Sequence, residues 1–512
     1  MCRRCFLLLS MILLPAVSLN AAAPSPINME ADSGSGRFVE MPAEVLEDKI
    51  RGGLLAQLLG NLNGLAHENK YYDEPGNVEE YTPALPDGAR TDDDTDIEWV
   101  YIVAMQRART AMLGPKQITE LWKKYINQRI WCSNLYVRRL MDIGIDPPLT
   151  GSLALNPWAN FNISGQFVCE TFGLIAPAMP QTAARIGLNY THVSIDGEPA
   201  QTTQLFTAMI STAFVTSDMN TILDAGVASI DPDSEIVPII SDVRRWHKEH
   251  PDDWRKTRRL VRDKYTLYES RTRNQNGYEL CTAATVAALL YGEGDLVKTL
   301  IHAFNFGWDA DNNAATAATI VGVIKGHGWM RQQGWEIKDT YRNTTRPLMP
   351  ENETITSFGD RIIEVARHVI TENGGATLWS WGLPTENDGD PDRSASGFYR
   401  IRVQEPGNVE RLADADKQVA ALRSAMRPQI RAGLADGATV AEQARAGYLA
   451  ICLGLAEPIR SRHPDRWTLA LAALHKQPKL LEVMFSRSPG PAGDKLRTAA
   501  AAAGLQKPET TN

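Results

Sequence analysis

The sequence predicts an all-α protein, a multi-helix bundle followed by a smaller C-terminal helical domain. The segment "IEWVYIVAMQRARTAM", residues 97–112, repeats apolar residues at helical spacing. The runs "LCTAATVAALLYGEGD" (280–295) and "NAATAATIVGVIKGHG" (313–328) are rich in alanine and contain glycine near their ends, as helix C-termini often do. The alternating apolar and polar patterns that are typical of strands are scarce.

The first 23 residues have the three-part pattern of a secretory signal peptide. Arg3 and Arg4 precede an apolar run from Phe6 to Leu19, which small residues follow. This run is shorter than the roughly 20 apolar residues that span a bilayer, so a membrane anchor is the weaker interpretation. We expect an exported protein, periplasmic or secreted, with no membrane association after signal cleavage and with residues 24–40 as a linker.

Length, charge and cysteine content limit the possible functions. A chain of 512 residues with 43% hydrophobic residues fits one large domain and a smaller one. The formal net charge of −8 argues against nucleic acid as a partner, and we expect a monomer. The cysteines outside the signal are too scattered for a disulfide framework, and one or two disulfides or free thiols both fit them. These cysteines are Cys132, Cys169, Cys281 and Cys452.

Helical periodicity stops near residue 375 and divides the chain. The segment "GGATLWSWGLPTENDGDPDRSASG" (374–397) is rich in Gly, Pro, Asp and Ser, so we predict a linker over 376–409 after a main domain of 41–375. The alanine-rich pattern of 410–490 predicts a helical domain without an acidic cluster, suited to packing or recognition. Residues 491–512 are predicted to be a disordered tail.

The segment "RTDDDTDIEW", residues 90–99, places Asp92, Asp93, Asp94 and Asp96 at the start of a helix. One acid there would cap the helix and suit its dipole, but four exceed that need. Carboxylates that converge usually bind a hard divalent cation such as Mg²⁺. We therefore predict a metal site here, with Asp96 further into the helix and facing solvent.

A second helix start carries the same excess of oxygen ligands. In "FGWDADNNAATAATIVGVIKG", residues 306–326, Asp309 and Asp311 are followed by Asn312. A capped, tightly packed core helix is the alternative interpretation of this segment. Two such helix starts in one helical chain predict that the helix ends meet around one metal site.

Together these motifs resemble those of the ADP-ribosylglycohydrolases. The late run contains Gly307, Asp309, Asp311, Ala314, Ala315, Gly322 and Gly326. The early helix "IRGGLLAQLLGNLNGLAHENK" (50–70) and the segment "FGLIAPAMPQTAARIGLNYTHVSIDG" (172–197) also resemble that family. The resemblance covers roughly residues 45–345. It implies an all-helical hydrolase with two Mg²⁺ ions, Mn²⁺ being an alternative, in an exported variant with an added C-terminal domain.

The resemblance implies three late ligands, Asp309, Asp311 and Asn312. Asn312 stands where the family has a hydroxyl, so a carbonyl oxygen replaces it. In the early helix Asn61 stands where the family commonly has Asp, which removes a charge.

The early motif aligns with the family's Thr-Asp-Asp-Thr in two registers. If Thr95 is the closing Thr, Asp93 and Asp94 are the paired acids and Asp92 replaces the opening Thr. If Thr91 is the opening Thr, the pair is Asp92 and Asp93. We favour the first register because it keeps the following apolar helix aligned, so Asp92, Asp93 and Asp94 are the predicted early ligands.

The resemblance also implies catalytic and substrate-binding residues. Cleavage at an anomeric carbon needs a carboxylate that activates water or stabilises oxocarbenium-like charge. Glu68 occupies the position of a functional Glu in many members, and Asp93 or Asp94 competes for that role.

The residues expected to bind substrate are His192, Gln166, Glu170 and Trp308. His192 lies in a family loop that borders the substrate, although a structural histidine fits the sequence equally well. Gln166 and Glu170 are expected in the same pocket. Trp308, next to Asp309, either stacks on a base or sugar face or belongs to the core.

The expected function is that of an exported, metal-dependent glycosyl hydrolase that acts on a small-molecule or glycan substrate. The bond is a ribosyl-type or other glycosidic bond, in an ADP-ribosyl conjugate or an extracellular glycan or glycoconjugate. The alternative is a non-catalytic protein that binds a nucleotide sugar or glycan in the same metal cleft. Asn312 and Asn61, which depart from the family pattern, keep this alternative open.

Overall fold

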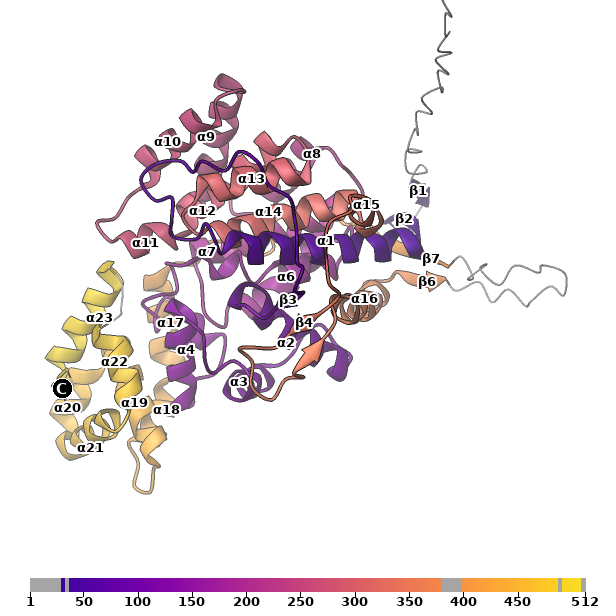
Figure 1. Ribbon diagram of the computed structural model, residues 1–512. Helices are drawn as coiled ribbons and strands as arrows, with labels where there is room; N and C mark the ends of the chain where they lie inside the picture. The colour runs from indigo at the N-terminus through magenta and orange to yellow at the C-terminus, as the bar shows by residue number, and fades with distance from the viewer. Residues whose placement is uncertain (1–28, 33–35, 379–396, 487–489, 508–512) are drawn as a thin grey trace, which may run out of the picture.

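Helices form most of the computed structural model, and they are arranged around a central pair (Figure 1). The structure describes residues 29–32, 36–378, 397–486 and 490–507. The predicted signal peptide, 1–23, lies outside these residues. Across the described ranges, no helix combines the length and apolar character needed to cross a membrane. The predicted all-α fold is confirmed.

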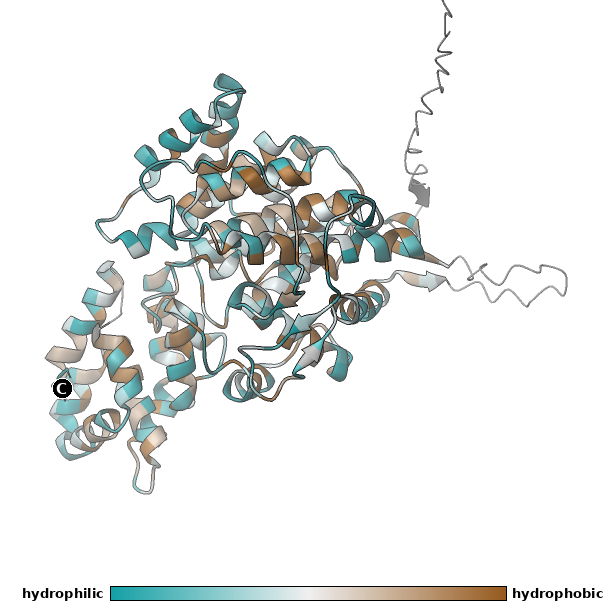
Figure 2. Ribbon diagram, in the orientation of Figure 1, coloured by the Kyte–Doolittle hydropathy of each residue, from teal (hydrophilic) through white to brown (hydrophobic). Residues whose placement is uncertain are grey.

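The central pair consists of α1 (Ala43–Gly64) and α14 (Ala310–Lys325), and the other helices of the main domain surround it. These helices are α2 (Asp93–Ala108), α3 (Pro115–Lys124), α4 (Cys132–Asp142), α5 (Glu170–Leu174), α6 (Pro180–Thr191), α7 (Glu198–Ala213), α8 (Met219–Ala228), α9 (Ile236–Glu249), α10 (Trp254–Tyr265), α11 (Arg271–Gln275), α12 (Tyr278–Gly292), α13 (Leu296–Phe306), α15 (His327–Gln332) and α16 (Ile355–Glu372), with short 3-10 helices at Leu149–Gly151 and Ile163–Gly165. Apolar residues gather on α13 and α14, whereas the outer helices α9 and α10 are mainly hydrophilic (Figure 2).

Small residues let α1 and α14 touch along their backbones. A Cβ added at Gly60 would lie 2.4 Å from the carbonyl oxygen of Ala314, and one at Gly64 would lie 2.4 Å from the Cα of Asp311. Only glycine permits this approach, because a side chain there would overlap backbone atoms. The end of α1 therefore lies against the start of α14, which brings Glu68 close to Asp311.

A small sheet fixes where α2 begins. Strand β3 (Ala89–Arg90) pairs in parallel with β4 (Tyr341–Arg342), which pairs antiparallel with β5 (Asn352–Glu353). Because α2 follows β3 after two residues, the sheet holds the acidic run beside the segment that follows β4.

Parts of both predicted linkers form a second sheet. Its strands run in the order β1 (Met29–Asp32), β2 (Gly36–Pro42), β7 (Phe398–Arg402) and β6 (Ala376–Leu378), and every pairing is antiparallel. Phe38 is opposite Arg402 and Pro42 is opposite Phe398. The predicted linkers 24–40 and 376–409 therefore contain strands. Local sequence patterns indicate these strands poorly, because each strand is short and its partner lies far away in the sequence.

The C-terminal helices share a core with the main domain. They are α17 (Ala415–Ala425), α18 (Arg427–Gly433), α19 (Val440–Cys452), α20 (Ala456–Arg462), α21 (Pro464–His475), α22 (Pro478–Ser486) and α23 (Gly490–Ala502). Tyr136 and Leu140 of α4 belong to the same apolar cluster as Leu449 and Trp467. The hydroxyl oxygens of Tyr136 and Tyr448 lie 2.8 Å apart. The second unit is helical, as expected, but it packs directly on α4 (Figure 1).

The predicted disordered tail, 491–512, is wrong for the residues that the structure describes. Residues Gly490–Ala502 form α23, and residues 508–512 lie outside the described part. Leu496 and Ala500, four positions apart, are buried on one face, and the indole of Trp467 donates a hydrogen bond to the carbonyl of Ala503. The alanine-rich composition is compatible with a helix, and packing against α21 stabilises it.

Candidate metal-dependent active site

Acidic side chains converge where α1 ends and where α2 and α14 begin. They lie on a cavity of about 960 Å³. These residues are Glu68, Asp92, Asp93, Asp94, Asp309 and Asp311. The structure thus brings together the predicted catalytic carboxylates and all the acidic residues predicted as metal ligands.

Five of the six acids form two sets that share one residue, and Asp93, a predicted early ligand, belongs to neither set. Glu68, Asp309 and Asp311 make the first set, and Asp92, Asp94 and Asp311 make the second. Within each set the ligand atoms lie within 4.8 Å of one another. Oxygen ligands that converge in this way suit a hard divalent cation, and the shared Asp311 places the two sets side by side.

Burial and mutual repulsion raise the pKa values of these acids. Burial raises the pKa of Asp94 and of Asp311 well above the usual range, and the carboxylates around them raise it further. For Glu68, burial and then the charge of Asp309 raise the pKa to about 7. A cation would offset this repulsion. One carboxylate oxygen of Asp311 has no hydrogen-bond partner in the described structure, which also fits a metal ligand.

Asn61, which stands where the family commonly has Asp, holds the early acids in place. Its amide nitrogen donates hydrogen bonds to Asp94 over 3.1 Å and to Asp92 over 3.3 Å. A carboxylate at this position would repel both acids, whereas the amide orients them. Sequence reasoning identified the substitution but not this positioning role.

Asn312 lies next to the metal set but not on the cavity lining. It is fully buried on α14, one residue after Asp311. Neither its amide oxygen nor its amide nitrogen has a hydrogen-bond partner among the described residues. Buried polar atoms are rarely left unpaired, so a metal ion or one of its water ligands would supply the partner that these two atoms lack.

Two of the expected substrate-binding residues are buried away from the cavity lining. Trp308 is fully buried, and the guanidinium of Arg258 lies 4.0 Å from the centroid of its ring. Gln166 is also fully buried and donates a hydrogen bond to the hydroxyl of Thr285 over 3.0 Å. Of the two alternatives for Trp308, a stacking residue or a core residue, the structure shows the core residue.

The other two expected substrate-binding residues also lie elsewhere. Glu170 is fully buried and accepts a hydrogen bond from the hydroxyl of Thr316. His192 lies 2.8 Å from a carboxylate oxygen of Glu410 through its Nε2, and 3.1 Å from the carbonyl of Ile195 through its Nδ1. It therefore connects the main domain to the segment that leads into the C-terminal helices.

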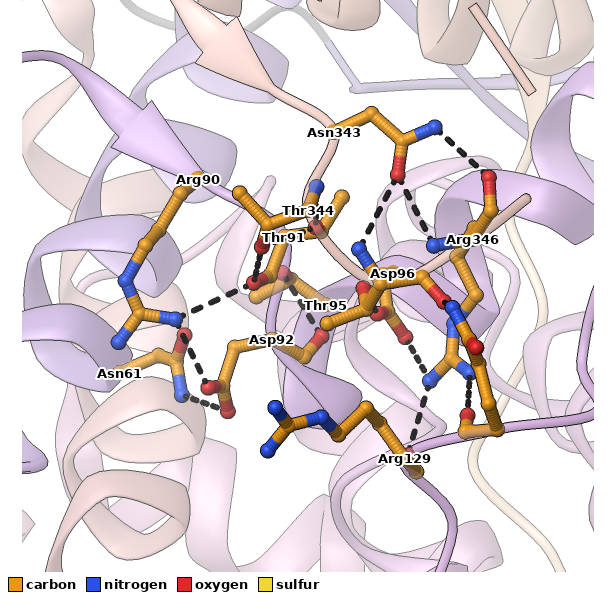
Figure 3. Close-up of polar contacts among 12 residues, drawn as sticks. Asn61, Arg90, Thr91, Asp92, Thr95, Asp96, Arg129, Asn343, Thr344 and Arg346 are labelled. Carbon is orange, nitrogen blue, oxygen red and sulfur yellow. Dashed lines mark hydrogen bonds and ion pairs between the residues drawn. The ribbon is translucent and has the colours of Figure 1, made fainter. Parts of the chain in front are cut away.

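Asp96 does not face solvent, so that prediction is wrong. It is fully buried, and one carboxylate oxygen lies 2.5 Å from the guanidinium of Arg346 (Figure 3). Thr345 donates a hydrogen bond to the other oxygen. The start of α2 thus directs Asp92 and Asp94 to the cavity and Asp96 to Arg346, because successive residues of a helix point in different directions.

The cavity lining also includes aromatic and apolar residues, which sequence reasoning missed. It contains Trp131, Trp158 and Phe161 from the main domain and Val483 from α22. The sequence signal is weak, because an aromatic residue such as Trp131 or Trp158 suits a core as well as a sugar-binding surface. The contribution of α22 had no local signal.

The match to a known family agrees with this geometry. The family model described as ADP-ribosylglycohydrolase matches residues 42–370, which include both acidic helix starts. No curated protein matches the chain. All six acids of the cavity lie inside the matched range, on an all-helical fold. The chain belongs to the ADP-ribosylglycohydrolase family, whose members are metal-dependent glycosyl hydrolases.

Proposed function

We propose that the protein is an exported, Mg²⁺-dependent glycosyl hydrolase. The bond that it cleaves is a ribosyl-type or other sugar glycosidic bond, in an ADP-ribosyl conjugate or in an extracellular glycan or glycoconjugate. The observation that carries this proposal is the pair of three-oxygen sets that share Asp311 on the cavity. The signal-like segment 1–23 supports export and favours the extracellular substrates.

Asp92, Asp94 and Asp311 would hold one ion, and Asp309 and Asp311 would hold the other, beside Glu68. Bound divalent cations lower the pKa of a water molecule and bind vicinal sugar hydroxyls. Asn61 keeps Asp92 and Asp94 oriented through its two hydrogen bonds. The side wall of Trp131, Trp158 and Phe161 supplies an apolar surface that excludes water from one side of the sugar.

Glu68 is the best placed group for proton transfer. It follows the end of α1, lines the cavity and is only partly buried, whereas Asp94 is buried. The Asn69 amide donates a hydrogen bond of 2.7 Å to one of its carboxylate oxygens, which fixes its orientation. In this proposal the carboxylate of Glu68 takes the proton of the attacking water, and the leaving-group oxygen takes a proton from solvent as the glycosidic bond breaks.

A product screen tests this function. Purified protein with Mg²⁺ is incubated with ADP-ribosylated protein and with glycan libraries, and released sugars are identified by mass spectrometry. We expect release from at least one substrate, loss of release with a chelator, and at least a hundredfold lower rate in Glu68→Gln, as general-base removal costs about 10²–10⁴. Glu120→Gln, an exposed glutamate on α3, is the control.

The non-catalytic alternative draws on Asn61 and Asn312, the two amides that depart from the family pattern. A protein that binds Mg²⁺ and a glycan with saturation, yet releases no sugar from any substrate, would favour it over hydrolysis. Export is tested separately, because a secreted protein that keeps its first 23 residues would contradict signal cleavage.

A further inference from the structure

The loop of residues 127–132 forms one rim of the cavity in an unfavourable backbone conformation. Arg129 has a φ of 50° and Cys132 a φ of 44°, both in the left-handed region. Residues other than glycine seldom adopt this conformation, and it persists only where the surroundings impose it. This loop, called the rim loop below, leads into α4 and carries Trp131 between the two strained residues.

A buried ion pair imposes the conformation of the rim loop. The guanidinium of Arg346 donates hydrogen bonds to the carbonyl oxygens of Gln128 over 2.7 Å and of Arg129 over 3.4 Å (Figure 3). The same guanidinium pairs with Asp96 over 2.5 Å, and both side chains of the pair are fully buried. The fourth acid of the early run thus supports the cavity rim through Arg346.

The rim loop presents two side chains to the cavity. Trp131 lines it and is nevertheless 55% exposed. The guanidinium of Arg129 reaches from the loop toward Asp92 (Figure 3), and it has no hydrogen bond or ion pair within the described residues. By contrast, Arg90 on the same cavity pairs with Asp92, and Arg273 pairs with Glu279. Arg129 is therefore available to a ligand.

We propose that Trp131 and Arg129 form a subsite for an anionic saccharide, a sugar ring that carries a carboxylate or sulfate group. The indole face binds the apolar face of the ring, and the guanidinium binds the anionic group through paired hydrogen bonds. The subsite rests on the proposed function, because it lies beside the acids that would cleave the bond. Asp96 and Arg346 are positioning residues that hold the rim loop.

Ligand binding to the full-length protein in Mg²⁺ tests the subsite. Isothermal calorimetry compares a uronic-acid disaccharide and a sulfated disaccharide with neutral cellobiose. We expect at least one anionic ligand to bind about tenfold more tightly than cellobiose, since a hydrogen bond to a charged group contributes about that factor. The ligand that does so distinguishes carboxylate recognition from sulfate recognition.

Substitutions of the two exposed side chains test whether Arg129 and Trp131 form the subsite. Arg129→Gln should remove the preference for the anionic ligand and leave stabilisation by Mg²⁺ unchanged. Trp131→Ala should weaken charged and neutral ligands alike. The controls are Arg331→Gln, an exposed arginine outside the cavity, and Leu469→Ala, which is 55% exposed as Trp131 is.

The proposal is overturned if no anionic ligand binds more tightly than cellobiose, or if Arg129→Gln changes affinity no more than Arg331→Gln does. Selective binding of an anionic saccharide without hydrolysis would instead contradict the proposed function and leave the subsite intact. The two ideas therefore fail on different measurements.

Discussion

At the scale of single residues, the acids at the start of α2 differ in role because they differ in partner. Asp94 lies beside Asp311 and accepts a hydrogen bond from Asn61, whereas Asp96 faces the guanidinium of Arg346. Two positions along a helix are enough to turn a side chain from the cavity to a buried pair. Each residue can therefore be tested by a different measurement.

Asp311→Asn should abolish metal binding, because Asp311 belongs to both ligand sets. Saturating Mg²⁺ should stabilise the wild-type protein by about 2–4 kcal/mol at 100 to 1,000 times the dissociation constant. The variant should show no such gain in thermal unfolding. Asp252→Asn, an exposed residue, is the control, and a full metal response in Asp311→Asn would refute the site.

Without metal, the protein should lose stability as the pH rises. The pKa of Glu68 rises from 4.5 to about 7 on folding, so between these values the folded state holds more protons than the unfolded state. The free energy of unfolding therefore falls as the pH rises through this window. Urea unfolding in a chelator at about pH 5 and about pH 8 measures this, and Mg²⁺ should reverse the trend.

Asp96→Asn and Asp93→Asn should have different effects. Asp96→Asn leaves Arg346 buried without its partner, which should cost about 3–5 kcal/mol of stability. Asp93 lies on the cavity, where burial and the charge of Asp92 raise its pKa. Asp93→Asn removes one of these repelling charges, so it should not destabilise the fold. It should lower activity, because it removes a carboxylate from the cavity. Chemical unfolding and turnover are measured for both, and the reverse pattern would contradict the assignment.

At the scale of elements, close packing of α1 on α14 creates the site, and a short strap connects it to the C-terminal helices. The strap, residues 408–412, lies on α7, where the Gln204 side chain donates to the carbonyl of Glu410 over 2.9 Å and accepts from its N–H over 3.1 Å. The Glu410 side chain bonds His192, and Gln418 of α17 donates to Asp196. Polar contacts thus hold the entry to the C-terminal domain.

His192→Gln should remove a pH-dependent part of this attachment. Burial alone would lower the pKa of His192, but the hydrogen bond and charge of Glu410 raise it to about 9. The stabilisation is therefore complete below the unfolded value of 6.5 and is lost as the pH rises through about 9. The free energy of unfolding is measured for wild type and variant at about pH 6 and about pH 10. The variant should be less stable than wild type at about pH 6 and equally stable at about pH 10.

The exposed His475 provides the control for this measurement. His475→Gln should leave the pH profile of the wild-type protein unchanged. Equal destabilisation of His192→Gln at both pH values would mean that the contact with Glu410 is not an ion pair.

At the scale of the whole molecule, the two helical units behave as one folded body around the cavity. The apolar side of α4 lies against α19 and α22, and Val483 of α22 lines the cavity. The C-terminal unit therefore has two roles, to cover α4 and to complete the cavity wall. Its cover of α4 is a packing role, whereas a role in recognition stays a prediction.

A chain that ends at Gly375 should not form a stable, soluble protein. The truncation uncovers Tyr136 and Leu140, and each such side chain contributes about 1.5–3 kcal/mol when it is buried. It also removes β7, the partner of β2. Size-exclusion chromatography and circular dichroism should show aggregation, whereas removal of residues 508–512 alone should have no effect. A monomeric, folded truncation with full metal binding would contradict the shared core.

The sequence by itself determined the fold class, the family and the acids of the candidate site. Helical periodicity and the glycines of α1 are local properties of the sequence. The two acidic helix starts are also local, because an excess of carboxylates can be recognised without knowing how the helices pack. Asp309 and Asp311 could therefore be identified without the structure.

Only the tertiary structure decided which partners these residues meet. Asp96 finds Arg346 some 250 positions away, β2 pairs with β7, and Val483 reaches the cavity from the far end of the chain. His192 and Trp308 looked like substrate residues because they lie near motifs in the sequence, yet packing turns one to Glu410 and buries the other. The physical reason is that local patterns fix the secondary structure, whereas the direction of a side chain and its distant contacts depend on how all the helices pack together.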